Sequence, residues 1–254
     1  MGLLNQISLV TGGSRGVGNA IAINFAKKGS DIAVVYRTGS SEAEATVAKI
    51  KSLGRNAVMI CADLRDPQQA RNAVDKTVSA LGGLNILVHS AGAQVKWNTI
   101  RESDAEQWAG YITNDLIGAF NILQPAIKYM HDNNGGRIIA ISSIAAQMCQ
   151  SRNSQGAAAK AGLEALIRVA AREEARKNIL INGISIGLTD TDQAREALDQ
   201  WGPEATAKII KSIPLGRIGQ PEEVAEMAAF LASDKGSYIT GKIFQVDGGQ
   251  IISG

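Results

Sequence analysis

A glycine-rich turn near the start of the chain has the residue types that bind a phosphate. It follows an apolar run from Ile7 to Val10 and reads TGGSRGVG over 11–18, with a helical pattern after it. Glycines let the backbone approach a phosphate closely, and the free N–H groups at a helix start favour an anion there. The spacing Thr-Gly-x-x-x-Gly-x-Gly differs from the usual dinucleotide fingerprint. Its position between the first strand and the first helix nevertheless predicts a nucleotide site.

The residues after the second expected strand indicate which nucleotide binds. NAD-binding proteins usually place an acidic residue there, which accepts hydrogen bonds from the ribose hydroxyls. This chain reads VVYRT over 34–38, without a carboxylate, and the glycine turn adds Arg15. Arg15 and Arg37 can hold a 2′-phosphate by charge-assisted hydrogen bonds, although each alone is as well explained as a solvated surface charge. Together they favour NADP(H) over NAD(H).

Strand and helix patterns alternate along the chain and must position these groups. Strands are expected at Ile7–Thr11, Asp31–Tyr36, Asn56–Cys61, Asn85–His89, Arg137–Ser142, Leu180–Ser185 and Lys242–Val246, and helices near 16–28, 41–53, 67–81, 104–131, 155–177 and 221–232. This alternation predicts an α/β fold, a doubly wound parallel sheet of the Rossmann type, in a single domain over 1–254. A polar loop and helix over 188–215 interrupt the pattern, where a substrate lid is expected.

Composition excludes several classes of protein. The chain has 254 residues, 45% of them apolar, which suffices for a sizeable core. A net charge of +2 is too balanced to predict binding to nucleic acid or to an anionic membrane. The apolar runs are strand-length, and no signal-peptide pattern opens the chain, so a cytoplasmic protein is expected. Cys61 and Cys149 form no metal-type or redox-type pair, and no metal site is predicted.

Further short motifs follow the expected strands at regular places. They are Asp63-Leu64, Ala91-Gly92, Ser142-Ser143, Lys160-Ala161-Gly162, Pro214–Arg217, Gly219–Val224 and Gly241–Gly249. With these motifs and the glycine turn, the chain resembles the short-chain dehydrogenase/reductase family nearly end to end, and is similar in layout to the β-ketoacyl carrier-protein reductases and related sugar dehydrogenases. The resemblance implies cofactor contacts from Gly12, Ser14, Arg15, Gly16, Val17, Gly18, Arg37, Thr38, Asp63, Leu64, Ser90, Ala91, Gly92, Lys160, Gly187 and Thr191.

The family's catalytic set is only partly present. The resemblance implies that Ser143 hydrogen-bonds a substrate oxygen and that Lys160 holds the nicotinamide ribose. The family's catalytic asparagine aligns with Asp115, and the tyrosine of its Tyr-x-x-x-Lys motif aligns with Gly156. The interval from Ser143 to position 156 fits the family, so the tyrosine is replaced rather than shifted. No tyrosine between Tyr129 and Tyr238 is available to substitute for it locally.

Loss of the tyrosine removes the family's proton donor. General acid catalysis is worth about 10²–10⁴ in rate, so hydride transfer could survive more slowly or with another proton source. Gly156 lowers helix stability by roughly 1 kcal/mol relative to Ala, and it implies space where a ring would lie. For Asp115 two roles are open and equally weighted. It either pairs with Lys160 through water and relays protons, or it replaces asparagine only to maintain a local kink.

The remaining polar residues have simpler explanations. His89 is expected to be a satisfied polar residue at a strand end, His131 a favourable residue at a helix C-terminus, and Cys149 an ordinary loop residue. The family resemblance also implies a homotetramer, or at least a dimer, assembled through the helices near 104–131 and 155–177 and the last strand. The second of these helices offers a face of small and aliphatic residues, including Leu163 and Ile167.

Three functions are compatible with these residues. The first is an NADP(H)-dependent oxidoreductase that reduces a small carbonyl compound. The second is an NADP(H)-binding protein without redox turnover, which acts as a sensor or structural partner. The third is a reductase of an imine or an activated alkene, whose mechanism needs no tyrosine acid. The resemblance to the family favours the first function, and the absence of a tyrosine at position 156 favours the other two. No residue identifies the substrate beyond a small molecule.

Overall fold

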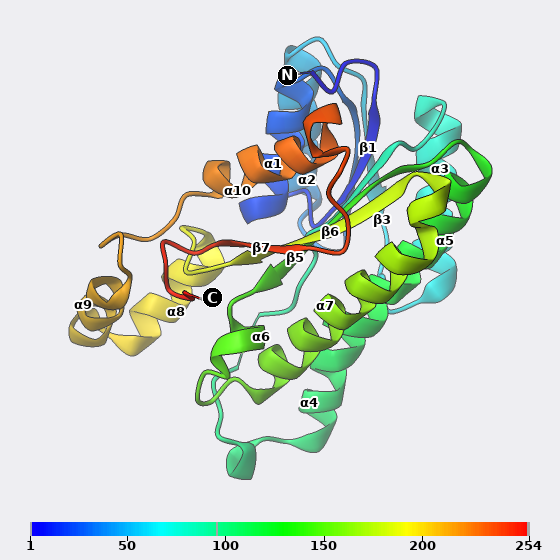
Figure 1. The fold of residues 1–254 in the computed structure, drawn as a ribbon. Helices are drawn as coiled ribbons and strands as arrows, with labels where there is room; N and C mark the ends of the chain where they lie inside the picture. Colours follow the sequence, from blue (N-terminus) through cyan, green and yellow to red (C-terminus); the bar gives the residue numbers. More distant parts are fainter. Residues whose placement is uncertain (1, 95, 253–254) are drawn as a thin grey trace.

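One parallel sheet organises the protein. The computed structural model describes residues 2–94 and 96–252, and within them seven parallel strands follow the order β3-β2-β1-β4-β5-β6-β7 (Figure 1). The strands are β1 (Ile7–Thr11), β2 (Asp31–Tyr36), β3 (Ala57–Cys61), β4 (Ile86–His89), β5 (Gly136–Ser143), β6 (Ile179–Ile186) and β7 (Ile243–Val246). The chain reverses its direction of progress across the sheet between β1 and β4. This switch point lies at the edge where ligands bind in doubly wound folds. The predicted fold class is therefore confirmed.

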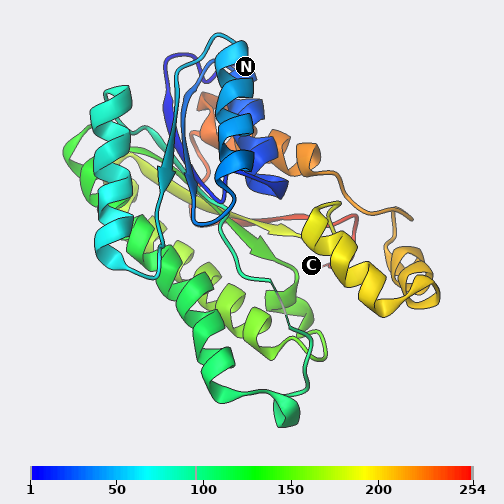
Figure 2. The same ribbon diagram turned by 180° about the vertical axis from the view of Figure 1, so that it is seen from behind.

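Helices cover both faces of the sheet. They are α1 (Gly16–Lys27), α2 (Ser40–Ser52), α3 (Pro67–Leu81), α4 (Ala105–Ile112), α5 (Gly118–Asp132), α6 (Ala145–Met148), α7 (Ser154–Glu174), α8 (Asp192–Trp201), α9 (Pro203–Ser212) and α10 (Pro221–Ala232). One buried apolar cluster joins α1, α2 and α10 to the sheet, and another joins α3, α5 and α7 to its other face (Figures 1 and 2). In the described ranges, no helix is both long enough and apolar enough to cross a bilayer.

The helix expected over 104–131 is not continuous. It consists of α4, a π-helical turn over Thr113–Ile117, and α5. A π-turn inserts one extra residue per turn and is frequent at functional sites. The turn contains Asp115, so the helical winding changes at the place where the sequence allowed for a local kink. The sequence did not predict α6, which is only one turn long.

The helix α7 shows which of its faces is free for assembly. Leu163 and Ile167, expected on an assembly face, are fully buried against the sheet of their own chain. The exposed side of α7 instead carries Ala158, Ala161 and the half-exposed Val169. That expectation was wrong for the two aliphatic residues, because a helix beside a sheet first buries its large side chains on its own core.

Two helices fill the predicted lid. Residues 188–215 contain α8 and α9, which meet at Gly202 with φ of +81°. Both figures show this pair standing away from the sheet, beyond the carboxyl end of β6. Thr191 caps α8 by accepting from the backbone N–H of Ala194 at 3.2 Å. The segment expected to form a lid is thus a helical hairpin that follows β6 at the carboxyl edge of the sheet.

Candidate active site

The glycine turn forms a tight cradle before α1. A Cβ at position 18 would lie 2.3 Å from the carbonyl oxygen of Gly12, and Gly16 has a φ of +55°. Only glycine fits position 18, and the positive φ at position 16 strongly favours glycine there. Arg15 is the N-cap of α1, and its side chain, which has no acceptor atom, does not cap the first N–H groups of the helix. The first N–H groups of α1 therefore remain available for an anion, and the cradle fits a nucleotide phosphate.

Thr11 ties this cradle to the end of β4. Its hydroxyl oxygen accepts from the backbone N–H groups of Ser90 at 3.1 Å and Ala91 at 3.2 Å. Because these two bonds use both lone pairs, the Thr11 hydroxyl donates its own proton to Nδ1 of His89, 3.0 Å away. The neutral tautomer of His89 thus carries its proton on Nε2. The predicted cofactor residues Ser90 and Ala91 lie directly against the glycine turn.

His89 is fully buried and neutral. Burial first, and the positive charge of Lys160 second, lower the pKa of His89 to about 3. Among the described residues, Nε2 has no hydrogen-bond partner. His89 is therefore only half satisfied, which corrects the expectation of a fully satisfied strand-end residue. A neutral imidazole with this pKa does not act as a general acid near neutral pH.

The corner beside β2 holds the predicted arginines and one carboxylate that the sequence analysis missed. Arg37 is exposed and donates to the Oδ1 atom of Asn114 at 2.8 Å. This bond occupies one of its five N–H groups, so the others remain for a phosphate. Glu42 points back to this corner from the first turn of α2. Its own backbone N–H, the Ser41 hydroxyl and the Arg15 charge all lower the pKa of Glu42, which keeps it ionised.

Asp115 is held at the centre of the site. Its side chain is 1% exposed, and Oδ1 accepts from the backbone N–H of Ala93 at 2.7 Å and from the Asn114 side chain at 2.9 Å. The π-turn carries this carboxylate to the loop that follows β4. Asp115 thus joins that loop to the helix, which fits the structural role that the sequence left open for it.

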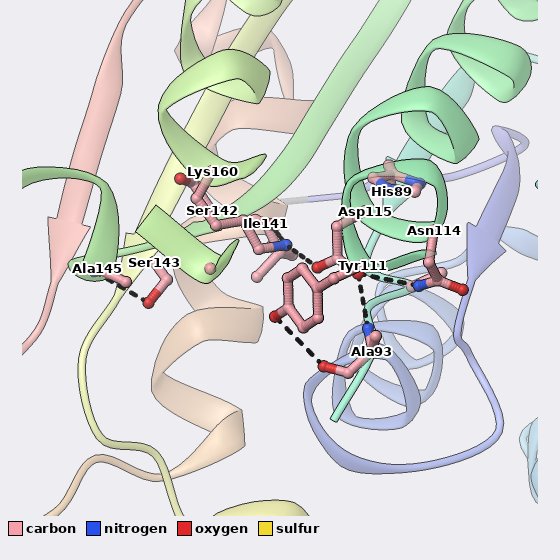
Figure 3. A network of polar contacts seen from close by, with 12 residues as sticks. His89, Ala93, Tyr111, Asn114, Asp115, Ile141, Ser142, Ser143, Ala145 and Lys160 are labelled. Atoms are coloured by element: carbon pink, nitrogen blue, oxygen red, sulfur yellow. Dashed lines mark hydrogen bonds and ion pairs between the residues drawn. The ribbon is translucent and has the colours of Figure 1, made fainter. Parts of the chain in front are cut away.

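Lys160 completes an ion pair with Asp115. Its Nζ lies 3.2 Å from Oδ2 of Asp115, at an angle unsuited to a hydrogen bond, and donates to the carbonyl oxygen of Ile141 at 3.4 Å (Figure 3). The predicted pair is therefore direct, without water between the partners. A Cβ on Gly92 would lie 3.3 Å from Asp115 Oδ2, so this glycine lets the β4 loop approach the pair. The arrangement anchors an ammonium group at the site, and among the described residues only one of its three protons is used in a hydrogen bond.

Ser143 stands at the last position of β5. Its hydroxyl oxygen accepts from the backbone N–H of Ala145 at 3.2 Å, so the hydroxyl proton is free to be donated (Figure 3). The neighbouring Ser142 turns the opposite way and bonds to Glu164 at 2.9 Å in the core. Only Ser143 of this pair is therefore oriented as a donor to a ligand at the sheet edge.

Gly156 does not leave an empty space. It lies in the first turn of α7, and Asn153 caps that turn by accepting from the Gly156 N–H at 3.2 Å. A Cβ at position 156 would lie 2.2 Å from Oδ1 of Asn153. The expectation of vacant room for a ring was wrong, because the capping amide occupies the place where a side chain would begin.

Tyr111 reaches the site from the last turn of α4. Its hydroxyl lies 3.5 Å from the carbonyl oxygen of Ala93, and burial and the nearby Asp115 charge, in that order, raise its pKa. Figure 3 shows the ring in front of the Asp115–Lys160 pair. The sequence analysis missed this tyrosine because it considered only substitutes near position 156 along the chain. A tyrosine four residues before the aligned catalytic position was the available signal.

Helix α8, in the segment where a lid is expected, contacts the loop after β4. Gln193 of α8 donates to the Ala93 carbonyl oxygen at 3.1 Å, and Gln94 donates to Glu196 of α8 at 2.5 Å. Trp97 of the loop meets Trp201 edge to face, with ring centroids 4.9 Å apart. A cavity of about 400 Å³ lies here, lined by Trp97, Gln150, Ser151, Arg152, Gln200, Trp201 and Ile209. A second, of about 260 Å³, extends on the α4 side past Ala93, Tyr111 and Asn114.

Two of the residues predicted to contact the cofactor lie near the glycine turn or in an ion pair of their own. Thr191 lies beside the glycine turn, with its Cγ2 atom 3.4 Å from a Cβ built on Gly16, so the lid and the turn meet. Asp63 is occupied by its ion pair with Arg65, whose side-chain hydrogen bond is the largest of several effects that lower the Asp63 pKa.

His131 pairs with Glu174 at 2.9 Å on α7, and Cys149 is exposed. Neither joins the polar network around Asp115.

Comparisons with known proteins identify the family of this chain. A family model described as enoyl-(acyl carrier protein) reductase matches residues 12–250. The 3-oxoacyl-[acyl-carrier-protein] reductase of Staphylococcus aureus is 35% identical over 246 residues, which cover 97% of this chain and 98% of the relative. A dehydrogenase/reductase from Sinorhizobium meliloti superposes with a TM-score of 0.92 at 32% identity, covering 99% of this chain and 97% of its own. Levodione reductase superposes with a TM-score of 0.94 at 28% identity, covering 97% and 98%. The chain therefore belongs to the short-chain dehydrogenase/reductase family of oxidoreductases.

Proposed function

We propose that the protein is an NADP(H)-dependent reductase of a small carbonyl compound. The observation that carries this proposal is the meeting of three groups at one sheet edge: the glycine cradle, the Asp115–Lys160 pair and the free hydroxyl proton of Ser143. The relatives include a reductase whose name specifies 3-oxoacyl groups on a carrier protein. A 3-oxoacyl thioester is accordingly the first substrate to test.

The preference for NADP(H) follows from the charges around the adenine end. Arg15 lies in the glycine turn, Arg37 directly follows β2, and no acidic residue ends β2. Charge-assisted hydrogen bonds of this type contribute about 1.5–3 kcal/mol each. The negative charge of Glu42 repels a 2′-phosphate and so reduces the preference for NADP(H) over NAD(H).

Each group of the site has a task in carbonyl reduction. Bound NADPH supplies the hydride that reduces the carbonyl carbon. Ser143 donates its free proton in a hydrogen bond to the carbonyl oxygen and polarises it. Lys160 keeps one proton for the nicotinamide ribose, while Asp115 and the Ile141 carbonyl fix its position. The lid over residues 188–215 excludes water when it closes.

The test is turnover of NADPH with a panel of carbonyl compounds that includes a 3-oxoacyl thioester. We expect loss of NADPH absorbance in the native protein and a loss of at least 10²-fold in kcat/KM for Ser143→Ala. Fluorescence titration should show tighter binding of NADPH than of NADH. Arg37→Asp should weaken NADPH binding about 10–100-fold. Equal affinities for the two nucleotides would contradict the proposed cofactor.

The same panel separates the other two functions. Imines and activated alkenes are included beside the carbonyl compounds. Turnover confined to these substrates would replace carbonyl reduction by reduction of another bond. Tight NADPH binding with no turnover of any substrate would instead support a sensor or structural role.

A further inference from the structure

A carbonyl reductase needs a proton donor, and position 156 does not supply one. Gly156 has no side chain, and the capping amide of Asn153 occupies the adjoining space. His89 is neutral and fully buried, with its proton on the ring nitrogen away from Thr11. Lys160 is already engaged by Asp115 and by the Ile141 carbonyl. Another O–H group must therefore be found within the site.

We propose that the Tyr111 hydroxyl gives the proton to the substrate oxygen, an inference that rests on the carbonyl reduction proposed above. Tyr111 lies four residues before Asp115, so the helix presents both side chains on the same side. In Figure 3 the phenol stands in front of the Asp115–Lys160 pair, and its hydroxyl is directed toward the space between Ser143 and Ala93. Tyr111 also lines the cavity beside α4.

The β4 loop fixes the position of the phenol relative to Asp115. The N–H of Ala93 donates to Asp115 at 2.7 Å, while the carbonyl oxygen of Ala93 faces the Tyr111 hydroxyl at 3.5 Å. One peptide residue therefore links the two side chains. A separation of 3.5 Å is at the long limit of a hydrogen bond, so the hydroxyl is only weakly held.

The lid frees this hydroxyl to turn. The side chain of Gln193 donates to the same Ala93 carbonyl oxygen at 3.1 Å, a shorter contact than that of Tyr111. When the phenol rotates toward a substrate, Ala93 keeps the partner that α8 provides. The rotation therefore leaves the partly buried Ala93 carbonyl oxygen with a hydrogen bond.

The proton balance of the step is simple. The carbonyl carbon gains a hydride, the C=O π electrons move to the oxygen, and the O–H bond of Tyr111 breaks as a new O–H bond forms on the substrate. An alkoxide is a stronger base than a phenolate, so the transfer is downhill. Water then returns one proton to the Tyr111 phenolate. Burial and the Asp115 charge raise the pKa of Tyr111, so the phenol starts each cycle protonated.

The experiment compares Tyr111→Phe with Tyr129→Phe in the full-length protein. Tyr129 lies on α5 outside the polar network and serves as the matched control. We expect Tyr111→Phe to lower kcat about 10²–10⁴-fold for the best carbonyl substrate, with NADPH affinity and thermal midpoint unchanged. Tyr129→Phe should leave kcat within about twofold.

A second readout requires no turnover. Binding of a non-reducible amide analogue of that substrate, followed by calorimetry without nucleotide, should weaken about 2–10-fold in Tyr111→Phe, because one hydrogen bond to the amide oxygen is lost. The combined variant Tyr111→Phe, Asn153→Ala, Gly156→Tyr should recover at least tenfold of the lost kcat, since a phenol again reaches the site.

The outcomes distinguish this inference from the proposed function. Turnover in the native protein that persists in Tyr111→Phe overturns the donor role and leaves carbonyl reduction intact. Absence of turnover in the native protein overturns carbonyl reduction and the donor role together. A loss of kcat in Tyr111→Phe accompanied by an equal loss of NADPH affinity also overturns the donor role, because it would reveal damage to the cofactor site.

Discussion

The Oδ1 atom of Asn153 stands 2.2 Å from the point where a Cβ on residue 156 would lie. The two positions therefore constrain each other, because the amide that caps α7 and a side chain at 156 compete for one place. We predict that Gly156→Tyr alone lowers the free energy of unfolding by about 1–3 kcal/mol, despite the better helix propensity of tyrosine.

A double-mutant cycle measures that competition. Asn153→Ala removes the cap and should cost about 0.5–2 kcal/mol by itself. Combined with Gly156→Tyr, it should destabilise less than the sum of the single changes, as measured by urea unfolding. Strict additivity of the two changes would mean that Asn153 and a side chain at position 156 do not compete.

Asp115→Asn tests the buried ion pair. The amide retains an acceptor for the Ala93 N–H, but Lys160 loses its negative partner while remaining largely buried. We predict a loss of about 1–3 kcal/mol in unfolding free energy, less than for a fully buried pair because Lys160 is 13% exposed. The double variant Asp115→Asn, Lys160→Met should recover part of that loss in urea unfolding. No recovery would indicate that Asp115 stabilises the fold through Ala93 alone.

His89 gives the protein a dependence of stability on pH. Folding lowers the pKa of His89 from 6.5 to about 3. Between these two pH values the unfolded chain therefore binds a proton at His89 that the folded chain does not bind. The contribution to stability is complete above pH 6.5 and declines as pH falls toward 3, by up to about 1.4 kcal/mol per pH unit. Urea unfolding between pH 7 and 5 should show this slope.

The variant His89→Asn isolates the effect. Asparagine does not titrate and keeps an acceptor for the Thr11 hydroxyl, so the native-minus-variant difference in unfolding free energy should shrink as pH falls from 6.5. A constant difference across this range would assign the acid sensitivity to the carboxylates instead.

The proposed homotetramer predicts a specific exposed face. On α5, Phe120 is 51% exposed, and on α7, Val169 is 54% exposed beside Ala158 and Ala161. Small residues at these places allow two helices to approach closely. We expect Phe120→Asp and Val169→Asp to shift the mass found by light scattering to smaller species. Leu4→Asp, at a position 66% exposed near the N-terminus, is the control that should not. A monomeric native protein at micromolar concentration would refute the assembly.

The sequence predicted the sheet well because β-branched runs recur between helical patterns. All seven expected strands agree with the structure to within one residue at each end, for example Leu180–Ser185 against Ile179–Ile186. Local pattern suffices there, since strands buried on both faces read as continuous apolar runs. The π-turn around Asp115 changes helical winding without changing composition, so periodicity over 104–131 did not reveal it.

The errors at the site share a physical cause. Whether Gly156 leaves space depends on the rotamer of Asn153, and the reach of Tyr111 depends on a helix that meets the β4 loop from another part of the chain. Such contacts arise from tertiary packing, and motif spacing does not contain them. Motif spacing did single out Lys160 and Asp115, which form an ion pair because facing helices converge at this edge of the sheet.

The Trp97–Trp201 contact should give a spectroscopic signal that depends on the position of α8. One indole belongs to the loop after β4 and the other to the end of α8, and they meet edge to face at 4.9 Å. Two chromophores held this close in a chiral arrangement couple their transitions and produce a paired signal in circular dichroism. Any movement that separates α8 from the loop erases that signal, whichever ligand causes it. The two indoles would therefore report any movement of α8 away from this loop without an attached dye.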